Sequence, residues 1–172
     1  MKRIPIVQGQ FRVVDEPDVM ITTVLGSCVA VCLHDCIARI GGMNHFLLAE
    51  PSPGNFTSQQ DMQRYGIHAM ELLINEMMKR GASRHHLRAH LYGGANIVAG
   101  LGNIGSTNAA FARRFVQTEG IGIGHCDLGG RHARRVEFRP YEGKARSAVV
   151  AESPPIAFQP RLFAATGDIE LF

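Results

Sequence analysis

The sequence lacks any hydrophobic run long enough to cross a membrane. Hydrophobic residues make up 45% of the 172 positions, but no apolar stretch approaches the roughly 20 residues that span a bilayer as a helix. The first residues, MKRIPIVQGQF, include two basic side chains but not the long apolar segment of a signal peptide. We therefore predict a cytoplasmic protein that does not insert into membranes.

Cysteine is also scarce, with single residues at Cys28, Cys32, Cys36 and Cys126, and we expect reduced thiols. The even spacing of the first three could suggest a zinc site. However, the valines around Cys28 favour a strand, along which residues four positions apart are separated by about 13 Å, too far to share one ion. We predict neither a metal nor a cofactor.

Strong charge of either sign is missing as well. The formal net charge is +3, and the basic spots at Arg113–Arg114 and Arg131–Arg135 contain no interleaved aromatic residues. Such spots are usually solvated surface, and an acidic protein partner is the next interpretation. Nucleic acid is a weak third, so we predict no nucleic-acid partner.

The length favours one domain, because a chain of this size can bury roughly 70% of its unfolded surface. The patterns of apolar residues predict a single α+β domain over residues 1–151. Residues 152–172 are weakly patterned, and we expect this tail to dock on the domain or on a partner. The expected strands cover 4–14 (a pair), 19–23, 28–34, 38–48, 87–92, 121–126, 135–138 and 145–150, and the expected helices cover 61–80 and 106–119.

The stretch from Thr22 to His45 organises the rest of the chain. Apolar residues alternate on both sides of a turn expected at Asp35-Cys36, which predicts an antiparallel hairpin. If the turn is centred there, facing residues have numbers that sum to about 71, so Cys28 faces Met43. His45 is then a diagonal neighbour of Cys28 on the same face, at a backbone distance of roughly 7–8 Å.

A thiol and an imidazole on one face are the parts of a cysteine nucleophile with its base. The corner at Gly26-Ser27 lies directly before Cys28 and can expose backbone N–H groups beside the thiol. The alternative is packing alone, because a cysteine in an apolar strand is usually a buried core residue, as we expect for Cys32. The residues by themselves leave both interpretations open.

A second motif competes for the functional assignment. Gly100–Gly105 reads GLGNIG, it opens an expected helix, and Asp127 follows after an expected strand, as in dinucleotide-binding folds. Against nucleotide binding, the preceding strand is expected to end near Tyr92, and no second βαβ half is present in the sequence. The other interpretation is a loop that lies close to another backbone, with Asn108 supplying hydrogen bonds.

A collinear series of segments resembles the CheD family of chemoreceptor glutamine deamidases. The central segments are TTVLGSCVAVCLHD, which contains Thr22-x5-Cys28, and GGMNHFLL, which contains His45. The likeness covers roughly residues 5–150. The further segments are RYGIHAMELLINEMMKRGA (64–82), YGGANI (92–97), NIGSTN (103–108) and DLGGRHARRVEF (127–138).

The resemblance implies an enzyme that converts glutamines on the cytoplasmic helices of methyl-accepting chemoreceptors to glutamates. It implies Cys28 as nucleophile, His45 as base and Thr22 as the group that orients the histidine. We expect the Cys28 backbone N–H, with the Gly26-Ser27 corner, to stabilise the oxyanion. It also implies a layered fold like that of the cytotoxic necrotizing factor deamidases.

Some members of the family bind a CheC-type phosphatase, which makes such a partner possible here. The alternative function is a non-catalytic chemotaxis adaptor that binds through its surface. The sequence departs from the family pattern at Ala49, where many members have proline, and in the loop at 50–60. These departures concern the docking surface and leave the three expected catalytic residues in place.

Overall fold

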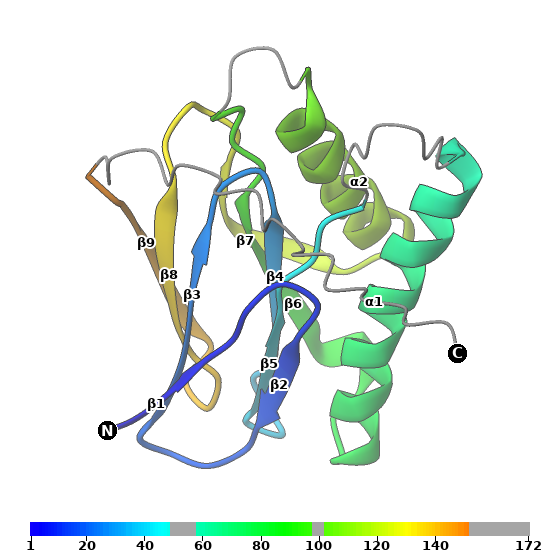
Figure 1. Ribbon diagram of the computed structural model, residues 1–172. Coiled ribbons are helices and arrows are strands. Elements are labelled where there is room, and N and C mark those ends of the chain that lie inside the picture. Colours follow the sequence, from blue (N-terminus) through cyan, green and yellow to red (C-terminus); the bar gives the residue numbers. More distant parts are fainter. Residues whose placement is uncertain (49–57, 98–101, 152–172) are drawn as a thin grey trace, which may run out of the picture.

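The chain folds into three stacked layers in the computed structural model, which describes residues 1–48, 58–97 and 102–151 (Figure 1). A four-stranded sheet is one outer layer, a five-stranded sheet is the middle layer, and two helices cover the far face of the middle sheet. The elements are β1 (Lys2–Pro5), β2 (Phe11–Val14), β3 (Val19–Leu25), β4 (Val29–Asp35), β5 (Ile40–Asn44), α1 (Gln59–Lys79), the 3-10 turn η1 (Arg84–His86), β6 (Leu87–Gly93), α2 (Ile104–Thr118), β7 (Gly122–Leu128), β8 (Arg134–Arg139) and β9 (Lys144–Val149).

This arrangement confirms the predicted mixed α and β fold and most of its elements. The outer sheet has the order β1-β3-β8-β9 and the middle sheet the order β2-β5-β4-β6-β7. The expected tail at 152–172 and most of the loop at 50–60 lie outside the described residues. None of the helices in the described ranges combines the length and apolarity needed to cross a bilayer.

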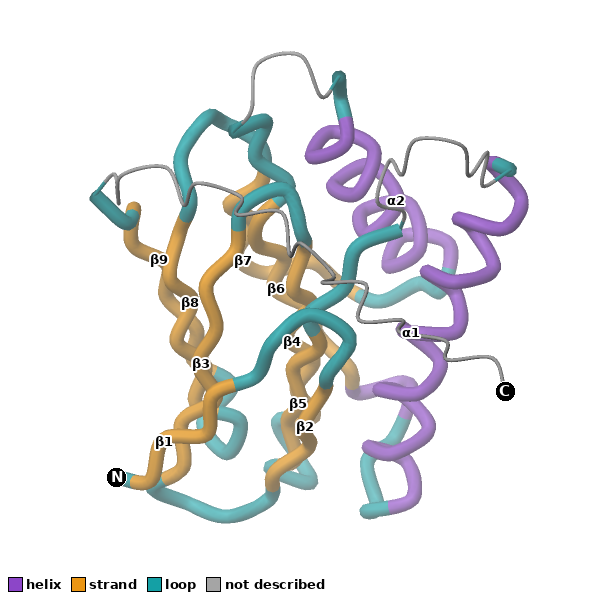
Figure 2. The backbone as a smooth tube through the Cα atoms, in the orientation of Figure 1, coloured by secondary structure: helices purple, strands orange, loops and turns teal. Residues whose placement is uncertain are grey.

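The expected pairing of the first two strands is wrong. β1 lies parallel to β3 in the outer sheet, whereas β2 lies antiparallel to β5 in the middle sheet. The chain between them, a turn over Val7–Gln10, crosses from one sheet to the other (Figure 2). Two short apolar segments joined by a turn are the pattern both of two strands that pair with each other and of two strands in different sheets. The sequence alone therefore did not distinguish these arrangements.

Helix α1 begins and ends where local chemistry predicts. The Ser58 side chain accepts a hydrogen bond from the Asp61 N–H (3.1 Å), which satisfies a donor left open at the helix start. At the other end Gly81 adopts a φ of +105°, a conformation that favours glycine and stops the helix.

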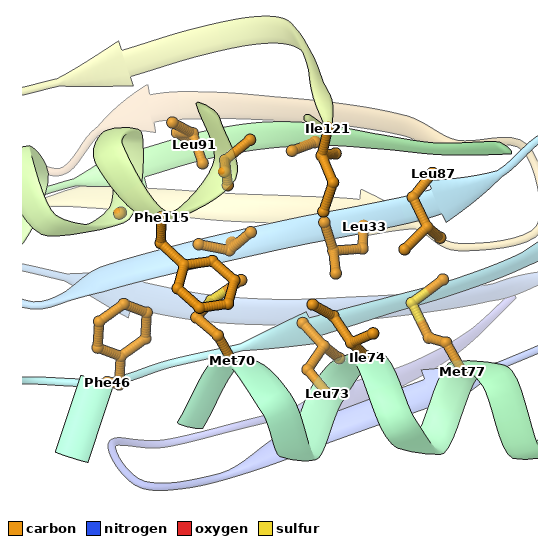
Figure 3. Close-up of a cluster of buried hydrophobic side chains, with 14 of the residues drawn as sticks. Leu33, Phe46, Met70, Leu73, Ile74, Met77, Leu87, Leu91, Phe115 and Ile121 are labelled. Carbon is orange, nitrogen blue, oxygen red and sulfur yellow. The ribbon is translucent and has the colours of Figure 1, made fainter. Parts of the chain in front are cut away.

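The larger apolar core lies between the helices and the middle sheet. Met70, Leu73, Ile74 and Met77 are fully buried, and their spacing places them on one face of α1. Figure 3 shows these side chains directed at Leu33 and its neighbours on the sheet. Burying a side chain of this size stabilises the fold by about 1.5–3 kcal/mol.

A smaller core lies between the two sheets. The middle sheet contributes Ala30 and Cys32, and the outer sheet contributes Ile21 and Phe138. The polar residue Thr23 is buried in the same interlayer, since β3 alternates between its two faces.

The hairpin of β4 and β5 has a different register from the predicted one. Cys32 pairs with Met43, so facing residues sum to 75 and not to about 71. The Asp35 carboxylate accepts hydrogen bonds from the N–H groups of Ile37 and Ala38 (both 2.9 Å), which moves the turn to residues 36–39. Because the shift is an even number of residues, every side chain keeps its predicted face.

Candidate active site

The hairpin continues beyond its ladder to the predicted nucleophile and base. Val29 and Phe46 form an isolated bridge in which each N–H bonds to the carbonyl of the other (3.0 and 2.9 Å). In this register Cys28 lies opposite Leu47, so His45 is its diagonal neighbour on the same face. The relationship predicted between the thiol and the imidazole is therefore retained, although it arises from a different pairing.

The histidine ring is held by a hydroxyl from the other sheet. Thr23 Oγ1 lies 2.8 Å from His45 Nδ1 and also donates to the Ile6 carbonyl at 2.8 Å. A hydroxyl has one hydrogen, and Ile6 takes it, so Thr23 must accept from Nδ1–H. The network thereby assigns the tautomer: Nδ1 carries the proton, and Nε2 carries the lone pair of a base.

Burial keeps this imidazole neutral. His45 is buried, and desolvation lowers its pKa from 6.5 to about 4. Within the described part of the chain, Nε2 has no hydrogen-bond partner, and an unsatisfied buried nitrogen costs about 1–3 kcal/mol. At neutral pH the ring is therefore uncharged, and its basic nitrogen is buried. A resting thiolate–imidazolium pair is disfavoured by the same desolvation.

The hydroxyl that meets the His45 ring belongs to Thr23, whereas the sequence predicted Thr22 as the orienting group. Along β3, Ile21, Thr23 and Leu25 are buried between the sheets, whereas Thr22 is only half-buried and Val24 is exposed. His45 reaches the interlayer from the middle sheet, where the inward-facing Thr23 meets it. Two adjacent threonines carry no sequence signal that tells which one faces inward.

The Gly26-Ser27-Cys28 corner is fixed by the segment that joins β6 to α2. All three of its carbonyl oxygens accept hydrogen bonds from that segment and the helix. The donors are Ala95 N to Gly26 O (3.0 Å), Asn108 Nδ2 to Ser27 O (2.9 Å) and Gly94 N to Cys28 O (2.8 Å). The peptide planes beside the nucleophile are thereby held in place.

A turn that the sequence analysis did not single out also borders the site. The Cys28 thiol donates to the Gln8 side chain, with 3.6 Å between Sγ and Oε1. The same turn bonds both backbone groups of His45, through Gly9 N to His45 O (2.8 Å) and His45 N to Gln10 O (3.0 Å). The turn glycine was the only signal of this contact in the sequence.

The glycine motif that competed for the assignment has a packing role at its described end. Gly105 lies so close to the segment that follows β6 that an added Cβ would be 2.3 Å from the Ala95 carbonyl oxygen. Asn108 also accepts from the Leu48 N–H at 3.1 Å. Asp127 forms an ion pair with Arg134 at 2.8 Å instead of being presented to a ribose. Gly100 lies outside the described residues.

A hollow of about 390 Å³ reaches His45 from the outer sheet. Thr22 lines it, together with the apolar side chains Val7 and Val24 and the basic side chains Arg3 and Arg135. Across the described ranges, no group of three or more His, Cys, Asp or Glu side chains could hold a metal ion.

Comparisons with known proteins point to one family. The family model described as CheD chemotactic sensory transduction matches residues 47–148. A Zymomonas mobilis protein named probable chemoreceptor glutamine deamidase CheD is 51% identical over 171 residues, which cover 99% of this chain and 93% of that protein. Proteins of the same name from Agrobacterium fabrum and Caulobacter vibrioides are 52% and 44% identical, over 84% and 99% of this chain and 78% and 93% of theirs. Among solved structures, a Neisseria meningitidis protein of family model DUF152 has a TM-score of 0.42 and 16% identity over 71% of this chain and 52% of its own.

Proposed function

Because the chain belongs to the CheD family, we propose that it is a chemoreceptor glutamine deamidase. In that reaction water replaces the amide nitrogen of a receptor glutamine, which leaves glutamate and ammonia. Relatives that are 44–52% identical carry this activity in their names. Within the chain, the proposal rests on the neutral His45 imidazole, which Thr23 holds on the face that Cys28 shares. Its basic nitrogen has no partner among residues 1–48, 58–97 and 102–151.

The proposed reaction begins with proton transfer from the Cys28 thiol to His45 Nε2. The sulfur attacks the glutamine carbonyl carbon and forms a tetrahedral oxyanion. The imidazolium returns its proton to the nitrogen, ammonia leaves, and a thioester remains on Cys28. Water activated by the same imidazole then hydrolyses the thioester, which releases glutamate and restores the thiol.

The low pKa of His45 determines when the proton moves from the thiol to the ring during the reaction. The pKa of about 4 makes a stable imidazolium unfavourable in the free protein, so we expect proton transfer to accompany attack on the substrate. Thr23 accepts from Nδ1–H, and this hydrogen bond strengthens as the ring becomes cationic. Thr23 takes the orienting role for which Thr22 was expected.

We propose the Cys28 backbone N–H as a donor to the oxyanion, next to Gly26-Ser27. The hydrogen bonds that hold all three carbonyls of the corner keep those oxygens away from a developing negative charge. Removing a donor of this kind typically costs about 2.7–4 kcal/mol of transition-state stabilisation.

The proposed substrates are glutamines on the cytoplasmic helices of chemoreceptors, and the protein would act in the cytoplasm. The hollow beside His45 suits such a surface, because it offers apolar contact at Val7 and Val24 and positive charge at Arg3 and Arg135. A CheC-type phosphatase as a second partner, and a fold relationship to the cytotoxic necrotizing factor deamidases, remain part of this proposal.

The decisive experiment is the intact mass of a purified chemoreceptor cytoplasmic fragment after incubation with the protein or with Cys28→Ala. We expect a gain of about one dalton for each converted glutamine, absent with the variant, because amide hydrolysis exchanges NH₂ for OH. An unchanged mass across several receptors from the same cell would contradict the enzyme and favour the binding role. A mass gain that persists with Cys28→Ala would contradict the cysteine mechanism.

A further inference from the structure

The side chain of Gln8 lies against the proposed nucleophile without having any assigned role. Its carboxamide oxygen is 3.6 Å from Cys28 Sγ and accepts a hydrogen bond from the thiol. Gln8 itself is exposed, so no core packing explains its position. A polar side chain beside a reacting sulfur can act on the charges that develop there.

The turn that carries Gln8 is closed by hydrogen bonds and is joined to the base. Gln10 N donates to the Val7 carbonyl (3.0 Å), and Val7 N donates to the Gln10 side chain (3.1 Å). Gly9, with a φ of +84°, allows the tight bend. Gly9 and Gln10 also bond the backbone of His45. The backbone next to Gln8 is therefore hydrogen-bonded to the residue that carries the imidazole.

A carboxamide suits both stages of the reaction at this place. Its oxygen accepts from the neutral thiol, and its NH₂ group offers two donors. Rotation about the terminal torsion, which is broad for such side chains, exchanges the two ends. Once the sulfur has lost its proton and attacked, the negative charge moves to the former carbonyl oxygen of the substrate, where an N–H donor is needed.

We propose that Gln8 is a catalytic residue of the deamidation, whose Nε2–H group donates to the tetrahedral oxyanion together with the Cys28 backbone N–H. The assignment rests on the proposed function, because it needs a carboxamide substrate and a cysteine nucleophile. It adds to that function a second oxyanion donor, supplied from the turn that crosses between the sheets.

The test is Gln8→Met, which keeps the length of the side chain and removes its donors. We expect kcat for deamidation of a receptor fragment to fall about 100-fold, in the range measured for oxyanion donors, with KM changed by less than about threefold. Alkylation of Cys28 by iodoacetamide forms no oxyanion, so its rate should change far less than kcat. Tandem mass spectrometry of the peptide that contains Cys28 follows this rate, with the exposed Cys36 as an internal reference.

Two further variants separate the proposed role from a general effect of the substitution. Gln117→Met removes an exposed glutamine on α2 and should leave kcat and alkylation unchanged. Gln8→Glu places an acceptor-only carboxylate beside the sulfur, so it should lower kcat at least as much as Gln8→Met. It should also slow alkylation, because a negative neighbour disfavours the thiolate.

Three results would overturn the role of Gln8. An unchanged kcat in Gln8→Met would show that no donor is needed from this side chain, and an equal fall in kcat and alkylation would show that it acts on the thiol alone. A Cys28-dependent gain of about one dalton at Gln8 itself would make it a substrate of the site. In the first two cases an active wild-type protein leaves the deamidase function standing, whereas an inactive wild type removes both proposals.

Discussion

The two faces of the middle sheet have different compositions and different tasks. The face toward the helices is filled with large apolar side chains such as Leu33 and Leu91, packed against α1 and α2. The face toward the outer sheet carries Ala30 together with the large side chains Met43 and Tyr92, and its end carries Cys28 and His45 beside Thr23. The larger apolar core thus lies on one face and the proposed chemistry on the other.

Alternation along a strand produces this division. In β4, Val31 and Leu33 face the helices, while Ala30 and Cys32 face the outer sheet. Packing against the helices requires only apolar side chains of suitable size. The proposed site requires a hydroxyl, an imidazole and a thiol at fixed positions relative to one another. Substitutions on the two faces should therefore produce different defects.

Cys28→Ala should give the largest effect on catalysis with little effect on folding. We expect deamidation to fall by about 10⁴-fold or more, because a missing nucleophile removes the covalent route. The matched control is Cys32→Ala, four residues along the chain, whose thiol is fully buried. That variant should lower the free energy of unfolding by about 1 kcal/mol and retain activity. Receptor-mass assays measure the activity of both variants, and denaturant titrations measure their stability. A similar loss of activity in both variants would contradict the prediction.

Leu73→Ala should produce the converse defect on the helix-facing side. Leu73 is fully buried in the larger core, and such truncations cost about 2–5 kcal/mol of unfolding free energy. The rate of deamidation per folded molecule should stay within about twofold, since no contact of the site is removed. Urea unfolding followed by circular dichroism, together with kcat at low temperature, measures both quantities. A loss of kcat greater than the unfolded fraction explains would show that the faces are coupled.

The buried imidazole should make stability depend on pH on the site-bearing face. The pKa of His45 is about 4 in the folded chain, against 6.5 as the ordinary value. Between these values the unfolded state binds more protons than the folded state, so stability falls as pH decreases from about 6.5 to 4. Across this pH range, His45 should lower the free energy of unfolding by roughly 3 kcal/mol. Above pH 6.5 its contribution to that free energy is constant.

His45→Gln is the control for this pH dependence, because it removes the titrating ring. The difference in unfolding free energy between the wild type and this variant, measured from pH 7.5 to 4, cancels the other groups. Those groups include His34 and His90, whose pKa values burial also lowers. A difference that does not vary with pH would contradict the lowered pKa of His45.

The sequence predicted the helix-facing side better than the site-facing side. The apolar spacing in 61–80, with Ser58 and Gly81 at its ends, predicts α1 because each signal is local. The hairpin register was wrong by four residues, yet Cys28 and His45 stayed on one face, since any even shift preserves the alternation.

The errors concern contacts between layers, which local patterns do not encode. The separation of β1 from β2 and the approach of Gln8 to Cys28 both depend on the turn that crosses between the sheets. The choice between Thr22 and Thr23 depends on which face of β3 packs inward, and both faces contain apolar residues. A shift of one residue along a strand reverses the direction of a side chain.

The smallest expected effect tests that choice directly. Thr23→Val removes the acceptor for His45 Nδ1–H, so we expect kcat to fall about tenfold, a part of what a general base contributes. Thr23→Ser keeps the hydroxyl and should restore most of the rate. Thr22→Val changes a residue that lines the hollow, so it should alter KM at most. Steady-state deamidation kinetics of the three variants decide between the threonines. If Thr22→Val lowered kcat more than Thr23→Val, the orienting hydroxyl would lie on the outward face, and the assignment of proton positions on His45 would fail with it.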